Sequence, residues 1–237
     1  GMTHITVGSN FACASDATVA SQFRPGQEPS DHRMFCWGDA TLGRHATLQS
    51  PEAGYRDQAA KSDHQVAAPM AGANHVCGGR RWVGRVGIWS SVGGVHCWGS
   101  DEQENQQLGV STSPTNYATS PRRADYGDGN RPGSSVLLAA GWNHNLVKID
   151  ERLFCFGAND ELQCGQAWGA TVSSPRQVEG LVVSGVGAAG ESHSCAMTSD
   201  DAVHCWGMND RGQLGRGASG PSTASSDVVV SLAGNAN

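Results

Sequence analysis

A sequence element that recurs along the chain limits what this protein can fold into more than any other feature. Near the C-terminus, a Gly-x-x-His segment that begins at Gly190 leads to Cys-Trp-Gly at 205–207 and then to Gly-Gln-Leu-Gly at 212–215. Related segments occur upstream, and the glycines that open successive copies lie at positions 8, 72, 141, 190 and 234. The chain therefore contains four full repeats and the first strand of a fifth.

Each repeat has the pattern of a small antiparallel sheet. In the last repeat, His193–Met197 and Ala202–Trp206 flank the polar residues Thr198–Asp201, which predicts a hairpin. The small apolar residues 181–189 predict a crowded strand before it. With 32 glycines among 237 residues and 16% charged residues, the composition also favours an all-β chain over a helical bundle. Such short strands cannot bury both faces of a sheet alone, so neighbouring repeats must cover one another.

The repeats predict one domain over 1–237. We place their boundaries near 5–66, 67–135, 136–183 and 184–227, followed by a terminal strand at 228–237. Segments rich in Gly, Pro, Ser and Asp lengthen the first two repeats, and they predict surface loops at 21–33, 44–63 and 111–135. The terminal strand copies the first element of the repeat. Either the ring has more than four blades, or this strand is surplus and can pair with another copy of the chain.

The Gly-x-x-His, Trp-Gly-x-Asn and Gly-Gln-Leu-Gly elements resemble the repeats of the regulator of chromosome condensation family of β-propellers. The accompanying cysteines make the chain most similar to the cysteine-bearing variant found in secreted bacterial repeat proteins and plant Crinkly-type receptor ectodomains. The resemblance implies an all-β, β-propeller-like fold. The family usually closes with seven blades, whereas this chain has four repeats and a strand, so closure of the ring stays open.

The eight cysteines follow the repeat, which suggests how they pair. In the third repeat Leu146 stands where the first cysteine belongs, and Cys164 provides a new partner for Cys155. The expected disulfides are Cys13–Cys36, Cys77–Cys97, Cys155–Cys164 and Cys195–Cys205. They indicate an oxidising compartment and hence a secreted or cell-surface protein. Free buried thiols and a zinc site are the alternatives, but no Cys-x-x-Cys motif occurs.

Histidines and aromatic residues also recur in register. The third residue after the opening glycine is His75, His144 or His193, with Phe11 in the first repeat. We expect each of these histidines to bond to the backbone of its own or the next blade, the alternative being a metal site in a central channel. The recurrent aromatic residues are expected to pack between blades, the alternative being a sugar-stacking platform: Trp37, Trp98, Phe156 and Trp206.

Aromatic and basic residues outside the repeat pattern are the better candidates for contact with a ligand, because packing does not require them. The candidates are Trp82, Trp89, Trp142, Trp168, Arg80, Arg81, Arg122 and Arg123. We expect both arginine pairs to lie in inserted regions, with Arg122 and Arg123 in the predicted loop at 111–135, and loops on a rigid scaffold often carry function. Solvated loops without a ligand are the alternative.

Composition and motifs narrow the function. A net charge of −6 argues against a nucleic-acid partner, and no apolar run is long enough to span a bilayer. No catalytic motif or cofactor motif is recognisable, so we expect neither an enzyme, nor a cofactor, nor a metal site. The expected function is a non-enzymatic extracellular module that binds a protein partner through a propeller face or inserted loops. The alternatives are a glycan-binding propeller lectin, a structural subunit assembling by strand exchange and, less favoured, a guanine-nucleotide exchange factor or chromatin binder.

Overall fold

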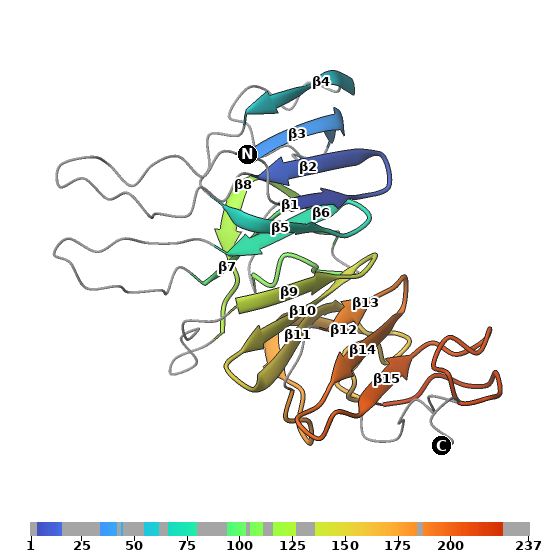
Figure 1. Cartoon of the computed structure of the whole chain (residues 1–237). Helices are drawn as coiled ribbons and strands as arrows, with labels where there is room; N and C mark the ends of the chain where they lie inside the picture. Colours follow the sequence, from blue (N-terminus) through green and yellow to red (C-terminus); the bar gives the residue numbers. More distant parts are fainter. Residues whose placement is uncertain are drawn as a thin grey trace, which may run out of the picture.

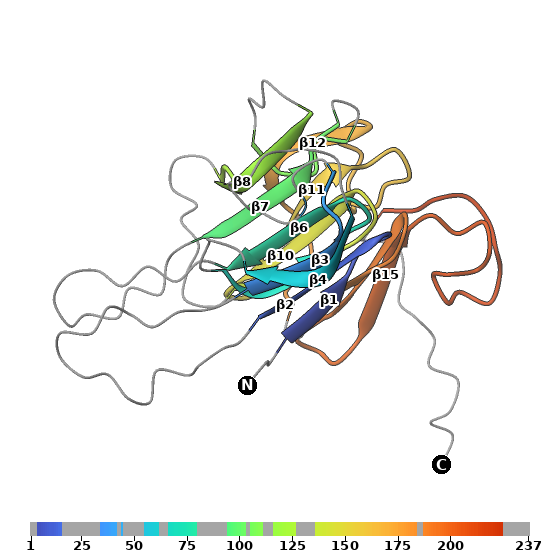
Figure 2. The same cartoon turned by 90° about the horizontal axis from the view of Figure 1, so that it is seen from above.

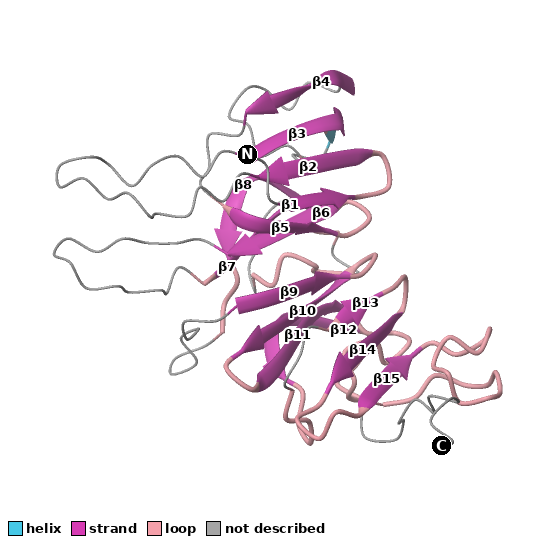
Figure 3. Cartoon of the chain, viewed as in Figure 1, coloured by secondary structure: helices cyan, strands magenta, loops and turns pink. Residues whose placement is uncertain are grey.

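The computed structural model confirms an all-β, propeller-like chain. The residues that it describes are 4–15, 34–41, 44, 55–61, 66–79, 94–102, 105–110, 116–126, 136–183 and 187–224. Within them the chain forms fifteen strands in four antiparallel sheets and no α-helix (Figure 3). The sheets, here called blades 1 to 4, follow one another in chain order and form an arc with blades 1 and 4 at opposite ends (Figure 1).

The blades share one meander topology, in which each strand pairs with the next along the chain. Blade 1 contains β1 (His4–Val7), β2 (Phe11–Ser15), β3 (Met34–Asp39) and β4 (Tyr55–Lys61). Blade 2 contains β5 (Ala67–Ala71), β6 (His75–Gly79), β7 (Val95–Ser100) and β8 (Tyr117–Arg123). Blade 3 contains β9 (Val136–Ala140), β10 (His144–Ile149), β11 (Arg152–Ala158) and β12 (Thr171–Gln177). Blade 4 contains β13 (Ala188–Ala189), β14 (His193–Met197) and β15 (Val203–Gly207).

A glycine with positive φ ends the regular part of the third strand in every blade. At Gly157, φ is +109°, and a Cβ atom would lie 2.3 Å from the carbonyl oxygen of Asn143. Gly38, Gly99 and Gly207 have φ between +95° and +102°. A Cβ atom on any of them would meet the equivalent carbonyl oxygen. Only glycine combines this backbone angle with so close an approach, which explains the Cys-aromatic-Gly element.

Two of the predicted loops contain outer strands, and there the prediction was wrong. β4 lies within 44–63 and β8 within 111–135. Both strands pair on one side only, with a register shift, so they lack the alternating hydrophobic pattern that marks a strand. A weaker signal existed in the sequence, because Ser-Pro-Arg occurs at 120–122 on β8 and again at 174–176 on β12.

Blade 4 has less regular structure than the prediction of a strand over 181–189 suggested. β13 covers only Ala188–Ala189, and Val183 forms an isolated bridge with Thr198. An outer strand is represented by a single bridge between Gly207 and Thr223. The loop that follows β15 projects away from the sheet (Figures 1 and 2). The predicted loop at 21–33 and the terminal strand at 228–237 lie outside the described residues.

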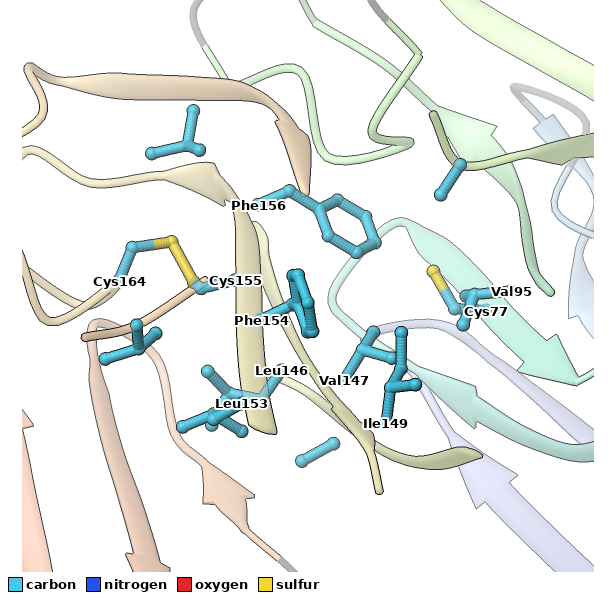
Figure 4. Packing of buried hydrophobic residues seen from close by; sticks show 14 of the residues in the cluster. Cys77, Val95, Leu146, Val147, Ile149, Leu153, Phe154, Cys155, Phe156 and Cys164 are labelled. Carbon is cyan, nitrogen blue, oxygen red and sulfur yellow. A yellow bond between two sulfur atoms is a disulfide. The ribbon is translucent and has the colours of Figure 1, made fainter. Parts of the chain in front are cut away.

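The core lies between consecutive blades, where a face of one sheet packs against a face of the next. The forward face of a blade, which carries the cysteines of its central strands, is turned toward the next blade along the chain. The rear face, which carries the recurrent aromatic residues, is turned toward the preceding blade. In blade 3, Phe154 and Phe156 lie on the side of blade 2, whereas Leu153 and the Cys155–Cys164 pair lie on the opposite side (Figure 4).

Candidate functional site

The turns that open the repeats meet at the inner side of the arc, which we call the hub (residues 8–10, 72–74, 141–143 and 190–192). Backbone hydrogen bonds connect these turns in sequence. The amide of Ser9 donates to the carbonyl of Ala73 at 3.0 Å, and the amide of Ala73 donates to Trp142 at 3.0 Å. The amide of Trp142 donates in turn to Gly190 at 3.2 Å. Each blade is therefore joined to the next at the hub by the backbone itself.

The opening glycine of each repeat is required by space. The residue three positions later folds its ring back over the glycine, and the glycine amide donates to the carbonyl of that same residue. A Cβ atom at Gly72 would lie 2.2 Å from the ring of His75, and one at Gly141 would lie equally close to the ring of His144. Any other residue would displace the ring, so the Gly-x-x-ring pattern encodes the turn.

The hub contains a hollow of about 210 Å³ whose walls are mainly glycine and alanine. The residue after the opening glycine borders this hollow in the first three repeats, as Ser9, Ala73 and Trp142. The fourth repeat has Glu191 at that position. Trp142 is therefore the large apolar side chain of the hub, and it is 51% exposed.

A buried polar clamp joins blade 2 to blade 3. Nε2 of His75 lies 2.9 Å from Oδ1 of Asn145, and Nδ2 of Asn145 donates to the carbonyl of Gln107 at 2.8 Å. Because the Asn145 amide nitrogen is the donor to Gln107, its oxygen must accept from His75. The ring of His75 therefore carries its proton on Nε2. The sequence predicted a backbone partner for this histidine, and that was wrong: the partner is a side chain of the next blade.

The same clamp joins blade 3 to blade 4 with different residues. Nε2 of His144 lies 2.8 Å from Oγ of Ser194, which donates to the carbonyl of Gln163 at 2.8 Å. The hydroxyl proton is thereby used, so His144 donates from Nε2. The indole of Trp206 donates to the same carbonyl at 2.9 Å.

Both clamp histidines are neutral. Burial lowers the pKa of His75 to about 4, although the bond to Asn145 opposes this shift. Burial lowers the pKa of His144 to about 3, with further contributions from the nearby His75 and His193. Their Nδ1 atoms have no hydrogen-bond partner among the described residues. A proton added to either ring would thus place an uncompensated charge between blades.

Blades 1 and 2 meet through a different pair. Phe11 replaces the histidine and Val76 replaces the polar partner, and both side chains belong to one buried cluster. The polar link between these blades comes instead from Arg44, which bonds to Asp39 at 2.5 Å and to Asn74 Oδ1 at 2.9 Å. Both positions of the clamp are therefore apolar at this interface, whereas both are polar at the other two.

Three of the four recurrent aromatic residues pack between blades, as the sequence predicted. Trp98, Phe156 and Trp206 are fully buried, and the Trp98 indole donates to the Arg44 carbonyl at 2.9 Å. Trp37 is half-buried, since no described blade precedes blade 1. A stacking platform in every blade would require these rings to be exposed.

The cysteines are joined within blades in the predicted pairs. Three of the pairs connect residues directly opposite each other on the central strands, with Cα atoms 4.1 Å apart: Cys13–Cys36, Cys77–Cys97 and Cys195–Cys205. In blade 3, Cys155 bonds to Cys164, whose Cα is 5.3 Å away. Oδ1 of Asn159 accepts from the amide of Cys164 at 2.9 Å and so fixes the loop that carries it.

The candidate ligand residues that the structure describes do not form one site. Trp142 lies at the hub. Trp168 follows β11, is partly buried against the core, and has the guanidinium of Arg176 5.7 Å from its ring centre. Arg122 and Arg123 end β8, on the outer edge of blade 2. Trp82, Trp89, Arg80 and Arg81 lie outside the described residues.

The residues that complete the clamps could not be predicted from the repeat. Asn145 and Ser194 occupy one repeat position, but no residue type recurs there, so the pattern gave no signal. Arg44 stands at the start of the predicted loop at 44–63, and no recurring residue type marks its position either. Among the described residues, no group of three or more His, Cys, Asp or Glu side chains is placed to hold a metal. No helix in that part of the chain is long and apolar enough to cross a membrane.

Sequence comparison identifies the repeat. A family model described as the regulator of chromosome condensation (RCC1) repeat matches residues 150–197, and a second model of the same description matches 187–213. Human E3 ubiquitin-protein ligase HERC2 is 31% identical over 85 residues, which are 35% of this chain and 2% of HERC2. Human protein RCC2 is 36% identical over 76 residues, which are 30% of this chain and 14% of RCC2. The chain thus spans a small part of these relatives.

Comparison of structures extends the likeness to the whole fold. Prp20p from Saccharomyces cerevisiae, described with its binding properties to Gsp1p and histones, has a TM-score of 0.68 and 17% identity. The match covers 97% of this chain and 50% of Prp20p. Human WBSCR16 has a TM-score of 0.61 and 16% identity, over 94% of this chain and 66% of its own. At these identities the likeness concerns the fold.

The clamp histidines predict that acid destabilises the protein. Between pH 6.5 and about 4 the unfolded chain binds a proton at His75 that the folded chain does not. The free energy of unfolding therefore falls as the pH is lowered through this range, and this contribution is fully retained above pH 6.5. The pKa shift of His75 corresponds to a decrease of roughly 3 kcal/mol in the free energy of unfolding. Urea unfolding at a series of pH values measures it.

A matched double variant identifies the clamp as the cause. His75→Phe with Asn145→Val copies the natural pair Phe11 and Val76. Each single variant leaves a buried polar group without its partner and costs about 1–3 kcal/mol, whereas the double variant costs less than their sum. The double variant also loses the part of the pH dependence due to His75. An unchanged pH dependence in the double variant would contradict the assignment.

Proposed function

The chain carries repeats of the regulator of chromosome condensation family over residues 150–213, and from this premise we propose that it is a non-enzymatic protein-binding module. Its partner contacts the hub around Trp142. The observation that carries the proposal is the exposure of this one tryptophan, 51%, at the edge of a hollow built from small residues. The recurrent tryptophans, in contrast, are needed between blades.

The backbone around Trp142 is already fixed. Its amide donates to Gly190 and its carbonyl accepts from Ala73, so binding would order little more than the side chain. Tryptophan is enriched among the residues that dominate protein interfaces, where it fills pockets with its large ring. The bordering Ala73 and Ala189 leave room beside the indole for a side chain of the partner. The hub thus combines a rigid support with an apolar anchor.

A protein partner fits these features better than the alternatives do. Prp20p, which shares the fold, is described with binding to Gsp1p and histones. A net charge of −6 disfavours nucleic acid. A lectin with one aromatic platform in each blade is disfavoured because Trp98, Phe156 and Trp206 are buried.

We place the module outside the cell or on its surface, in line with the cysteine-bearing variant that the sequence resembles. All eight cysteines are paired and none is left free. Disulfides persist in oxidising compartments, and each closed loop is expected to stabilise the fold by roughly 2–4 kcal/mol. Oxidised cysteines also make an intracellular exchange-factor or chromatin role the less favoured alternative.

Substitution of Trp142 tests the hub. Wild-type protein and Trp142→Ala are screened against an array of extracellular protein domains and a glycan array, and melting temperatures confirm that both are folded. We expect protein ligands whose affinity falls at least about tenfold in the variant, because a central tryptophan contributes about 2 kcal/mol or more.

Val182→Ala is the matched control, since Val182 is 52% exposed and lies beyond the far end of β14 from the hub. This variant should bind like the wild type. Protein ligands unaffected by Trp142→Ala would refute the hub as the binding surface, and ligands found only on the glycan array would favour a lectin.

The cysteine pairs predict the redox state of the purified protein. Intact mass with and without reduction, after alkylation in denaturant, should show four disulfides and no free thiol. Peptide mapping should find each bond at the pairs described above. Eight alkylated cysteines without reduction would contradict the extracellular assignment and revive the exchange-factor and chromatin alternatives.

A further inference from the structure

Glu191 is the charged residue of the hub. The four turns of the hub otherwise consist of glycine, alanine, serine, asparagine and Trp142. Glu191 follows the opening glycine in blade 4, at the position that Trp142 takes in blade 3. Its side chain is exposed, and its carboxylate has no hydrogen bond or ion pair with any other residue that the structure describes. The hub therefore offers a negative charge that the described part of the chain does not neutralise.

The backbone brings Glu191 next to Trp142. The amide of Trp142 donates to the carbonyl of Gly190 at 3.2 Å, and the peptide unit of that carbonyl ends at the Cα atom of Glu191. The two side chains therefore leave neighbouring points of the hub backbone, and both are exposed. An aromatic ring attracts a cation to its face, and a carboxylate accepts charge-assisted hydrogen bonds from it. This combination favours a positively charged ligand group.

The hollow of the hub fits the uncharged part of an arginine side chain. Trp142 lines this hollow together with several alanines, so methyl groups lie beside the indole: Ala73, Ala140 and Ala189. The methylene groups of an arginine pack along apolar surface while its charged end stays in a polar environment. Its guanidinium is planar, stacks on aromatic rings and binds a carboxylate through two parallel N–H donors, which the ammonium group of lysine cannot do. Shape and charge together therefore favour arginine.

The chain forms one such contact internally, in blade 3. The guanidinium carbon of Arg176 lies 5.7 Å from the ring centre of Trp168. Among the described residues, by contrast, neither a cation nor a second ring contacts the indole of Trp142. A net charge of −6 also favours the approach of a basic partner. Trp142 thus offers to a partner the contact that Trp168 makes within its own blade.

We propose that the hub binds an arginine side chain of the protein partner, whose guanidinium stacks on the indole of Trp142 and pairs with the carboxylate of Glu191. The methylene groups of this arginine lie along the small residues of the hollow. The inference rests on the proposed function, because it names the partner's contact at the same surface. Trp142 supplies the contact area, and Glu191 supplies the selectivity for a positive charge.

Short peptides with blocked ends, each carrying one arginine, lysine or citrulline between glycines, test this site. Citrulline has the shape of arginine but no charge. Titrations at low salt follow the indole N–H signal of Trp142 in the NMR spectrum of the ¹⁵N-labelled protein, and its loss in Trp142→Ala identifies that signal. We expect the arginine peptide to shift this signal and to bind at least about fivefold more tightly than the citrulline peptide. The lysine peptide should bind more weakly than the arginine peptide.

Substitution of Glu191 tests the source of the selectivity. Glu191→Gln keeps the size of the side chain and should weaken binding of the arginine peptide about threefold, while binding of the citrulline peptide stays unchanged. Glu151→Gln is the matched control, because it removes the same charge from an exposed residue between β10 and β11, at the opposite end of these strands from the hub. This control should bind all three peptides like the wild type. Circular dichroism confirms that each variant is folded.

Three results would overturn the arginine site. The first is that no peptide shifts the Trp142 signal, and the second is that the citrulline or lysine peptide binds as tightly as the arginine peptide. The third is that Glu151→Gln weakens arginine binding as much as Glu191→Gln, because net charge would then be responsible. None of these results decides the proposed function, which stands or falls with the loss of protein ligands in Trp142→Ala.

Discussion

The backbone hydrogen bonds of the hub hold the blades in place, and the rest of the structure depends on them. Ser9, Ala73 and Trp142 each donate to the turn of the next blade. This arrangement requires a tight turn in every repeat, and the turn requires a glycine beneath the ring three residues later. The recurrent Gly-x-x-ring pattern therefore reflects a main-chain contact between blades. It also explains why the hub is small and rigid, and why a single large side chain such as Trp142 stands out there.

The hub sets the spacing of the blades, and the side chains between them provide selectivity. A histidine clamp, an apolar pair or an arginine can occupy an interface, provided that both sides change together. The neutral, fully buried His75 and His144 show the cost of a mismatch, since neither ring can lose its partner or gain a proton without leaving an uncompensated polar group. The apolar pair of Phe11 and Val76 removes that cost at the first interface.

Much of the fold could be predicted from the sequence, because the features that repeat are those that every blade needs. The glycine turns, the central hairpins and the cross-strand pairing seen for Cys13 and Cys36 recur, so they could be predicted. The outer strands were hidden, since an edge strand such as β8 has no alternating pattern. Asn145 and Ser194 were hidden because a clamp is a relation between two blades, and only its histidine recurs within one. Trp142 was recognised as off-pattern, but its exposure at the hub became visible only in the structure.

Amide hydrogen exchange of the folded protein tests most directly whether the hub bonds join the blades. Trp142 is 51% exposed, so burial alone does not protect its amide. If this amide is held by the next blade, it should exchange as slowly as the amide of Leu146 in the centre of blade 3. Exchange as fast as that of an amide without a hydrogen-bond acceptor would contradict the account, because the blades would then be held by side-chain packing alone.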